Sequence, residues 1–237
     1  MKTPSAITIK GKHVTVFPLT RDLSRELYAI GQEPELWTFV STNPFEQLAD
    51  VERYIDRLLS AQSKGDRVPL AVRDNVSGRL AGATSYLHID AMHCSIEIGG
   101  TWYGKEFRRT SVNTETKLLL LIHAFEYLRV NRVQFQTDSR NERSQHAIER
   151  IGAKKEGILR ANKVYPSGYI RDSVVYSIVR DEWADARRQL EQRKAWCCRR
   201  SYGPRLQCRG HAHVAQMCIC QSSTPIHQVS IYLHLAM

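Results

Sequence analysis

The sequence predicts a mixed α/β (α+β) protein in which a central twisted mixed sheet is flanked by helices. Three observations lead to this fold class. Several short segments alternate apolar and polar residues with the period of a strand, other segments repeat apolar residues every three or four positions, and no internal repeat divides the chain. The predicted order is strand, two helices, three strands, helix, strand, helix and two strands. An antiparallel run of strands that leads into a strand–helix–strand unit has this order.

The N-terminal half contains the first three predicted strands and two helices. Val14 and Val16 alternate with polar or aromatic neighbours, and Thr20 is the expected N-cap of the helix that follows. The turn-rich segment 74–78 joins two strands into a predicted hairpin. In order, these elements are a strand over residues 13–18, a helix that starts at 19, a helix that follows 41–44 and includes 48–59, and strands over 68–72 and 80–87.

The C-terminal half contains the strand–helix–strand unit. Ile96 and Ile98 share one face of the first strand, so Glu97 points to the other face. Gly152 is a suitable terminator for the short helix before it. A parallel step in this unit leaves strand ends apart near Asn113, where the long helix starts, and such a crevice suits a ligand. The elements are a strand over 94–102, a helix over 113–128, a strand over 130–137, a helix over 141–151, and strands over 154–159 and 171–179.

Composition narrows the class of protein. The chain of 237 residues is 42% hydrophobic and 24% charged, which is ordinary for a soluble globular protein. No apolar run approaches the roughly 18 residues that span a bilayer, and the N-terminus lacks the apolar stretch of a secretory signal. We therefore expect a cytoplasmic protein with no membrane partner. The net charge of +10 suits a polyanionic ligand such as a phosphorylated cofactor or nucleic acid, although no nucleic-acid-binding module is recognisable.

The last part of the chain has a different composition from the rest. Residues 195–237 contain no Asp or Glu but hold five of the six cysteines and four histidines. The spacing of these cysteines and histidines fits no zinc motif, so we predict no metal site. We expect one domain over residues 1–194 and a Cys/His/Arg-containing tail over 195–237 that is a disordered or aberrant extension.

Two segments combine a helix start with polar or basic residues. The loop that leads from the strand over 94–102 into the next helix contains Arg108-x-x-Ser111-x-Asn113. A helix N-terminus offers unpaired N–H donors and a partial positive charge, which suit a phosphate. The second segment contains Asn141-x-x-Ser144 and then the short helix that ends at Gly152. Its simpler interpretation is an N-cap asparagine followed by an exposed serine.

A third segment, with Lys155-Glu-Gly-Ile-Leu-Arg160 and then Arg171-Asp172 after a glycine-containing turn, reads as a closing hairpin. The order and spacing of the three segments, over about residues 10–190, resemble the GNAT superfamily of N-acetyltransferases, in its ribosomal-protein-acetyltransferase (RimJ/RimL-like) branch. The resemblance implies the GNAT acyl-CoA N-acyltransferase fold. It also implies an enzyme that transfers acetyl from acetyl-CoA to a primary amine.

The resemblance assigns the first loop to the pyrophosphate of coenzyme A and the asparagine to the pantetheine arm. In the family the loop reads Q/R-x-x-G-x-G/A, so Ser111 and Asn113 stand here at the glycine-type positions. Small polar residues leave the backbone open, though less freely than glycine does. The implied coenzyme-binding residues are Arg108, Arg109, Thr110, Ser111, Val112, Asn113, Thr114 and Asn141.

The same resemblance suggests two catalytic residues. Glu97 is the candidate base, acting through water, because partial burial raises the pKa of a carboxyl group and suits it to proton transfer; a surface glutamate paired with a cation is the alternative. Ser144 is the candidate donor of a hydrogen bond to the departing sulfur. At pH 7 an α-amine costs about 1.4 kcal/mol to deprotonate and a lysine side chain about 4.6 kcal/mol. This difference favours an α-amine, and the resemblance points to protein N-termini, with small amines as alternatives.

Two other classes of protein stay open on the sequence alone. A non-catalytic acyl-CoA-binding module of the same fold would bind the coenzyme without turnover. A nucleic-acid-binding protein, suggested only by the basic balance, would bind DNA or RNA with a steep salt dependence.

Overall fold

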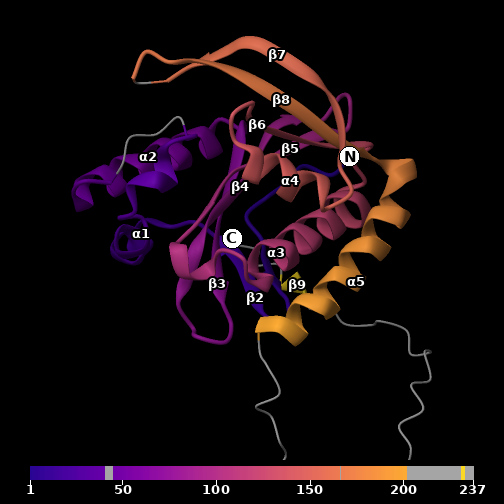
Figure 1. Cartoon of the computed structure of the whole chain (residues 1–237), viewed down its shortest axis with the longest axis horizontal. Coiled ribbons are helices and arrows are strands. Elements are labelled where there is room, and N and C mark those ends of the chain that lie inside the picture. The colour runs from indigo at the N-terminus through magenta and orange to yellow at the C-terminus, as the bar shows by residue number, and fades with distance from the viewer. Residues whose placement is uncertain (41–44, 166, 202–230, 233–237) are drawn as a thin grey trace, which may run out of the picture.

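A computed structural model describes residues 1–40, 45–165, 167–201 and 231–232. Nine strands form one sheet in the order β7-β8-β6-β5-β4-β3-β2-β1-β9, with helices on both faces (Figure 1). The mixed α/β class with a central sheet is therefore confirmed. The strands are β1 (Thr8–Lys10), β2 (Val14–Pro18), β3 (Arg67–Asp74), β4 (Leu80–Asp90), β5 (Ser95–Tyr103), β6 (Arg132–Asp138), β7 (Lys154–Val164), β8 (Ile170–Val179) and β9 (Ile231–Tyr232).

Five α-helices lie among the described residues: α1 (Ser24–Ile30), α2 (Leu48–Ser63), α3 (Ser111–Ile122), α4 (Glu142–Glu149) and α5 (Trp183–Ser201). Helices α1 and α2 pack over one face of the sheet, against β3 and β4. Helix α3 lies on the opposite face and α5 packs against α3 (Figure 1). The apolar stripe of α2 that the sequence predicts is confirmed, with Val51, Ile55 and Leu58 buried.

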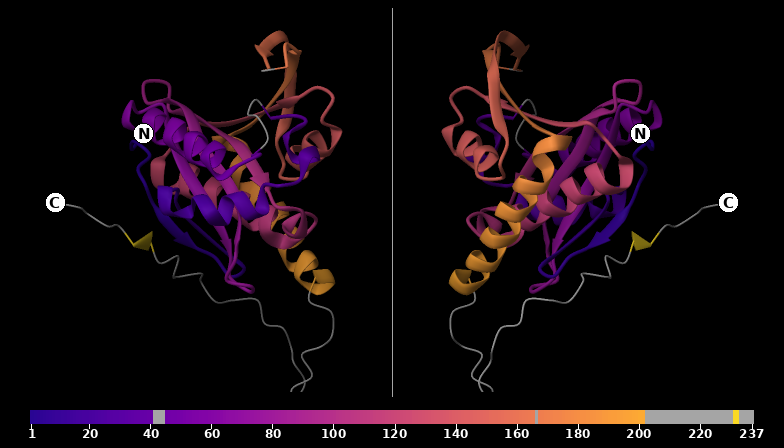
Figure 2. Two further views of the ribbon diagram at one scale, coloured as in Figure 1. Left: turned by 90° about the vertical axis from the view of Figure 1, so that its left-hand side faces the viewer. Right: turned by 90° about the vertical axis from the view of Figure 1, so that its right-hand side faces the viewer.

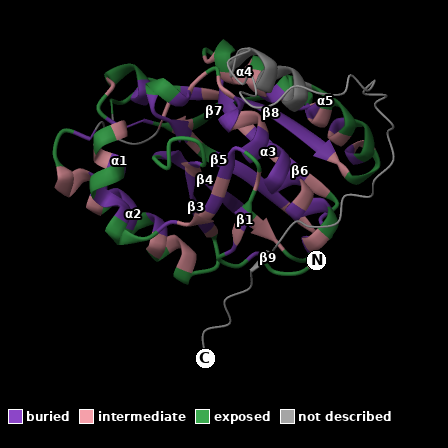
Figure 3. Cartoon of the chain, turned by 90° about the horizontal axis from the view of Figure 1, so that it is seen from below, coloured by how far each residue is buried: buried purple, intermediate pink, exposed green. Residues whose placement is uncertain are grey.

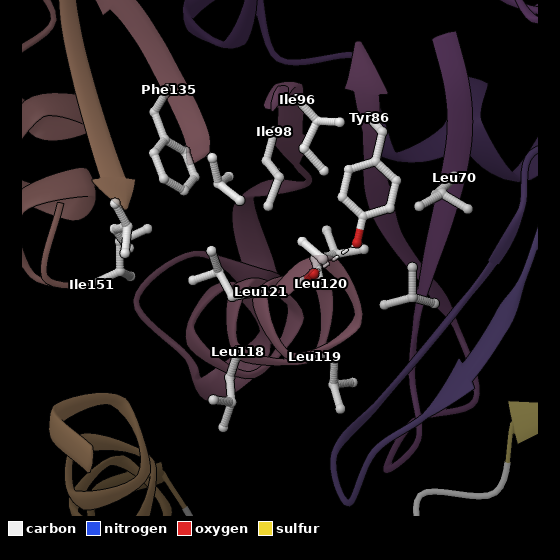
Figure 4. Close-up of a cluster of buried hydrophobic side chains, with 14 of the residues drawn as sticks. Leu70, Tyr86, Ile96, Ile98, Leu118, Leu119, Leu120, Leu121, Phe135 and Ile151 are labelled. Atoms are coloured by element: carbon white, nitrogen blue, oxygen red, sulfur yellow. Dashed lines mark hydrogen bonds between the residues drawn. The ribbon is translucent and has the colours of Figure 1, made fainter. Parts of the chain in front are cut away.

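The larger core lies between the sheet and α3. Leu118 to Leu121 of α3 are all buried: Leu120 and Leu121 point toward the central strands, whereas Leu118 and Leu119 lie on the far side of the helix (Figure 4). Most of α3 is buried (Figure 3). Tyr86 reaches from β4 across this core, and its hydroxyl donates to the carbonyl oxygen of Leu120 at 2.7 Å. Ile96 and Ile98 belong to this core, so Glu97 lies on the other face of β5, as the alternation predicts.

Several predicted boundaries were wrong. Thr20 makes no side-chain cap; residues Arg21–Leu23 form a 3₁₀ turn and α1 begins only at Ser24. Helix α3 begins at Ser111, two residues before the predicted start at Asn113, because Thr110 supplies the cap; its predicted end at residue 128 is reached through the π-helical turn His123–Leu128. Strand β7 continues to Val164, five residues beyond its predicted end.

Three elements were missed. Strand β1 has only three residues, too short for an alternating pattern, and α5 has a weak apolar stripe among many charges. Strand β9 lies within the predicted tail, where it pairs with β1. Most of the tail, 202–230 and 233–237, lies outside the described residues, so its predicted character stays a prediction.

Strands β7 and β8 form a long hairpin that stands out from the body of the sheet (Figure 2). Its far end is tied to the segment between α1 and α2, because the hydroxyl of Tyr165 donates to the carbonyl oxygen of Phe39 at 2.8 Å. The hairpin therefore reaches over the face of the sheet that carries α1 and α2 (Figure 1). No helix in the described part of the chain is long and apolar enough to cross a membrane.

Candidate active site

The candidate site is built around the parallel pair β5 and β6. Their ladder contains only three pairs, and Glu97 opposite Gln134 is the last. Beyond it β5 runs to Tyr103 and β6 to Asp138 without pairing to each other, which confirms the predicted parting of the strands. A bulge helps to cause it: the pairing of β4 with β5 shifts register there, and Gly100 adopts a left-handed φ of 59°.

The part of β6 that no longer pairs with β5 holds a polar atom without a hydrogen-bond partner. The side-chain oxygen Oε1 of Gln136 is buried and has no hydrogen-bond partner in the described structure. A buried amide oxygen normally accepts a hydrogen bond, so this atom is an acceptor available to a ligand N–H. Coenzyme A carries two amides along its pantetheine arm, and an acceptor at this position fits such a group.

The N-terminus of α3 follows the open end of β5. The hydroxyl of Thr110 accepts from the N–H of Val112 at 3.2 Å and donates to the carbonyl of Phe107 at 2.7 Å. The first turn of a helix has more N–H donors than one cap can satisfy, so the turn retains donors for an anion. Ser111 and Val112 are buried, whereas Asn113 and Thr114 are partly exposed.

The two arginines of this loop differ in their contacts. Arg108 donates from Nε to the carbonyl of Tyr103 at 3.1 Å, and its Nη2 lies 2.6 Å from Oε2 of Glu33. Arg109 is exposed and has a left-handed φ of 60°. Arg108 therefore holds the loop to Glu33 through an ion pair. Arg109 is the exposed cation of the loop and can contact an anionic ligand.

A cavity of about 490 Å³ lies beside this ion pair, between the start of the loop and the end of α1, and two of its lining residues, Glu33 and Glu106, are acidic. Lys105 is the one cation in its lining, so the walls do not suit a pyrophosphate. We therefore assign no coenzyme contact to this cavity.

Helix α4 follows the open end of β6. Oδ1 of Asn141 accepts from the N–H of Ser144 at 3.0 Å, which makes Asn141 the N-cap of α4. The cap uses only the oxygen, so the side-chain nitrogen is still a donor. Ser144 is partly exposed on the first turn. Because the C-terminal ends of parallel strands share one edge of the sheet, the loops that carry Arg109 and Asn141 leave from the same side of the site.

Glu97 lies where the ladder ends, and the residue is only 3% exposed. Its Oε2 lies 2.9 Å from Nδ1 of His88 and 3.3 Å from Nε2 of Gln134. The sequence reasoning missed His88 because the partner depends on register: the β4–β5 hairpin pairs Leu87 with Glu97. Regular alternation would turn His88 to the other face of β4; it reaches the carboxylate because the register shifts after Leu87 and its φ of 48° is left-handed.

A second polar chain lies on the α3 side of the same strands, and the sequence reasoning missed it too. Nζ of Lys117 donates to the hydroxyl of Thr101 at 2.8 Å, and Thr101 shares a hydrogen bond of 2.8 Å with Thr84. Burial lowers the pKa of Lys117 to about 7, although the charge of Glu97 opposes the shift. An amine buried in a leucine-rich helix gave no sequence signal, because one lysine in an apolar stripe reads as a surface residue.

Metal binding finds no support in the described residues: no three His, Cys, Asp or Glu side chains there are grouped closely enough to hold an ion. The Cys and His of the tail lie outside that region, apart from Cys197 and Cys198, whose side chains are not described.

Comparisons with known proteins agree on one family. The family model described as "Acetyltransferase (GNAT) domain" matches residues 13–154. The chain is 36% identical to a candidate acetyltransferase from T. thermophilus, whose solved structure matches with a TM-score of 0.74 over 81% of this chain and 99% of that one. A GCN5-related N-acetyltransferase from Brucella melitensis matches with a TM-score of 0.76 and 27% identity, over 81% of this chain and 86% of that one. The chain therefore belongs to the GNAT acetyltransferase family.

Two further relatives carry more specific names. A curated protein of Bacillus subtilis (strain 168), named as a candidate ribosomal N-acetyltransferase, YdaF, is 37% identical over 106 residues. The match covers 45% of this chain and 57% of YdaF, so the chain spans little more than half of that relative. Mycobacterium smegmatis RimJ, solved in complex with CoA-disulfide, shares the fold with a TM-score of 0.67 and 16% identity over 80% of this chain and 93% of that one.

Proposed function

We propose that this protein transfers the acetyl group of acetyl-CoA to a primary amine, and that its acceptor is the α-amine of a polypeptide N-terminus. One observation carries the proposal. Strands β5 and β6 stop pairing at Glu97 and separate from there toward the N-terminus of α3. A buried carboxylate therefore lies at the point where the two strands begin to separate. A thioester and an amine need such an arrangement, with an anion-binding turn at one end and a proton acceptor at the other.

The loop geometry supports binding of the coenzyme at this place. The N–H donors in the first turn of α3 and the charge of Arg109 suit the pyrophosphate. Oε1 of Gln136 and the free side-chain nitrogen of Asn141 supply an acceptor and a donor for the pantetheine amides. When bound, the coenzyme supplies an activated acetyl group.

The proton chemistry belongs to Glu97 and His88. Glu97 accepts the proton of the acceptor ammonium, directly or through one water. The imidazole of His88, whose Nδ1 lies 2.9 Å from Oε2 of Glu97, connects this carboxylate to solvent. Ser144, on the first turn of α4, donates a hydrogen bond to the departing sulfur. The carboxylate and imidazole let the free amine form near pH 7, where an α-amine costs about 1.4 kcal/mol to deprotonate.

The polypeptide acceptor rests on two grounds. An α-amine is the less demanding base to generate. The name of YdaF links that protein to the ribosome, and a ribosomal protein N-terminus in the cytoplasm is the acceptor we infer.

The test is a thioester-consumption assay of the full chain with acetyl-CoA. The acceptor panel contains peptides with free N-termini, the same peptides with blocked N-termini, polyamines and amino sugars. We expect thiol release with the free peptides and none with the blocked ones, and mass spectrometry should find the acetyl group on the α-amine. Binding of acetyl-CoA by calorimetry without turnover of any amine would instead indicate a non-catalytic coenzyme-binding module.

A further inference from the structure

A buried guanidinium on β8 has one free edge. Arg171 is 7% exposed, and its Nη1 donates to the hydroxyl of Tyr165 at 3.3 Å. Its other two nitrogens, Nε and Nη2, are buried and have no hydrogen-bond partner in the described structure. A buried charge without a hydrogen-bonded partner is costly, so this edge is expected to meet an anion.

The two free nitrogens have a specific geometry. Nε and Nη2 lie on the same edge of the planar guanidinium, and their two N–H groups point the same way. That edge matches the two oxygens of a carboxylate, which it binds with two parallel hydrogen bonds. The orphan atoms of Arg171 therefore form a complete carboxylate-binding edge.

The protein's own nearby carboxylate does not fill this edge. Asp138 is the acid whose pKa the charge of Arg171 helps to lower, but the carboxylate is held by Arg140. Oδ1 of Asp138 accepts from the backbone N–H of Arg140 at 2.9 Å, and the guanidinium of Arg140 contacts both oxygens at 3.2 Å. The charge of Asp138 acts on Arg171, but no described residue supplies a hydrogen-bond acceptor to its Nε and Nη2.

The free edge lies on the face of the sheet that carries Glu97, the proposed base. Val174 and Tyr176 belong to the core under α3, so Arg171 alternates to the opposite face, the face that carries Glu97. Lys163 is its direct partner in the β7–β8 register and shares that face.

The charges of this region are close enough to act on one another. Burial lowers the pKa of Lys163, repulsion from Arg171 adds to the shift, and the charge of Glu97 opposes it. Arg67 of β3 also contributes repulsion at Lys163. Lys163 thus lies within electrostatic reach of two further cations, Arg171 and Arg67, and of Glu97, and this excess of positive charge favours an anionic acceptor.

We propose that the Nε and Nη2 edge of Arg171, with Lys163 beside it, binds a carboxylate of the acceptor, so that this acetyltransferase selects amines that carry an acidic group. The inference rests on the proposed acetyl transfer. A neutral acceptor leaves the buried guanidinium unpaired, whereas an acidic acceptor supplies two charge-assisted hydrogen bonds. For a polypeptide, the acidic group is a side chain at one of its first positions.

The test compares peptides that differ only in this charge. Tetrapeptide amides with free N-termini carry Asp or Asn, Glu or Gln, and phosphoserine or Ser at position 1 or 2, and kcat/KM is measured from thiol release. For the wild-type chain we expect the kcat/KM of the better acidic peptide to exceed that of its neutral counterpart by about tenfold or more. Arg171→Met and Arg171→Gln should bring that ratio close to one, and Arg171→Lys should retain part of it.

Arg160→Met, an exposed arginine of the same hairpin, is the matched control and should keep the wild-type ratio. A ratio near one in the wild type, or an unchanged ratio in folded Arg171→Met and Arg171→Gln, would overturn the inference. Preference for phosphoserine over Asp and Glu would also overturn the assignment to a carboxylate. Thermal unfolding shows which variants fold. If Arg171→Met and Arg171→Gln do not fold, the ratio measured for Arg171→Lys provides the test.

A failure of acetyl transfer itself is distinguished by binding. If no peptide is turned over, calorimetry with the same peptides in the presence of coenzyme A decides. Tighter binding of the acidic peptide by the wild type, lost in Arg171→Gln, supports the anion site although the proposed reaction fails. Equal binding of the Asp and Asn peptides overturns the anion site as well.

Discussion

Nδ1 of His88 lies 2.9 Å from Oε2 of Glu97, and the two side chains differ sharply in exposure, at 63% for the histidine and 4% for the glutamate. The pair therefore links a buried carboxylate to solvent through one imidazole. His88 is held toward Glu97 by an unusual backbone, since its φ of 48° is left-handed. Non-glycine residues in this region are uncommon and are found at functional sites more often than elsewhere.

Replacing this carboxylate tests its role as the base. We expect Glu97→Gln to lower kcat by about a hundredfold or more, because general base catalysis contributes on that scale. The pH profile of kcat/KM should lose one ionisation, while the affinity for acetyl-CoA stays unchanged. Exposed Glu35→Gln is the control and should behave as wild type. Wild-type turnover with an unaltered pH profile in Glu97→Gln would leave water and the amine's own pKa to provide the free base.

Asn141 offers a way to separate folding from coenzyme binding. Asn141→Ala removes the cap of α4 and should lower stability by about 1 kcal/mol. Asn141→Asp keeps the capping oxygen but loses the side-chain nitrogen, so we expect near-normal stability and weaker acetyl-CoA binding by calorimetry. Ser144→Ala, in the first turn of the same helix, is the companion variant: it should reduce kcat with little change in coenzyme affinity. If Asn141→Asp binds acetyl-CoA normally, the asparagine is a cap alone.

The exposed arginine of the α3 loop is the cleaner test of the anion site. Reversing the charge of Arg108 would place a second acid beside Glu33 and disturb the loop, so a change in acetyl-CoA affinity would not identify a direct contact. Arg109→Glu changes only an exposed charge, and we expect it to weaken acetyl-CoA binding by about tenfold at low salt and less at high salt. Arg109→Gly should weaken binding less, because glycine adopts the left-handed φ of 60° without strain. Unchanged affinity in Arg109→Glu at physiological salt would move the pyrophosphate elsewhere.

The sequence predicted those parts of the fold that rest on local patterns. The stripe of α2 and the alternation of Ile96, Glu97 and Ile98 depend on neighbours a few residues apart, and both were confirmed. Thr20 was predicted as an N-cap from its residue type, but a 3₁₀ turn follows it and its side chain makes no capping hydrogen bond. Residue preference alone therefore did not predict the start of α1. Helix α5 was missed because its few buried positions lie among charged residues.

The site was less predictable because its contacts are long-range. Arg108 forms an ion pair with Glu33, which lies 75 positions earlier in the sequence, and Lys117 of α3 donates a hydrogen bond to Thr101 of β5. No spacing rule encodes such pairs. The open edge of Arg171 is visible only once Asp138 is seen to be held by Arg140.

The C-terminal part of the chain gives a test of the domain boundary. Within the described side chains, α5 contributes Trp183, Ala186 and Leu190 to the core, all before Lys194. We therefore expect truncation after Lys194 to preserve folding, with a small change in Tm and unchanged kcat. Truncation after Glu182 removes all three buried residues and should prevent folding. Loss of folding after the first truncation, with stoichiometric zinc in the full chain, would show that the tail is structural.

The last prediction concerns Lys117, whose burial makes stability depend on pH. The pKa of its ammonium is lowered from 10.5 to about 7 in the folded protein, chiefly by burial. Between these two values the unfolded chain binds the proton and the folded chain does not, so the free energy of unfolding rises with pH by up to about 1.4 kcal/mol per unit. The contribution of this group is complete above 10.5 and is lost as the pH falls to about 7.

Lys117→Met keeps the volume and removes the titration, so the variant should exceed the wild type in stability most at pH 7. Urea unfolding at pH 7, 8, 9 and 9.5 measures this advantage, which should shrink as the pH rises. Burial lowers the pKa of His123 to about 4, so that group changes stability only at lower pH, and the buried tyrosines are common to both proteins. Leu118→Met, a core change with no titrating group, should give a difference that does not vary with pH. Parallel stability curves for wild type and Lys117→Met would mean that the ammonium stays charged in the folded protein, with Thr101 and the charge of Glu97 sufficient to hold it.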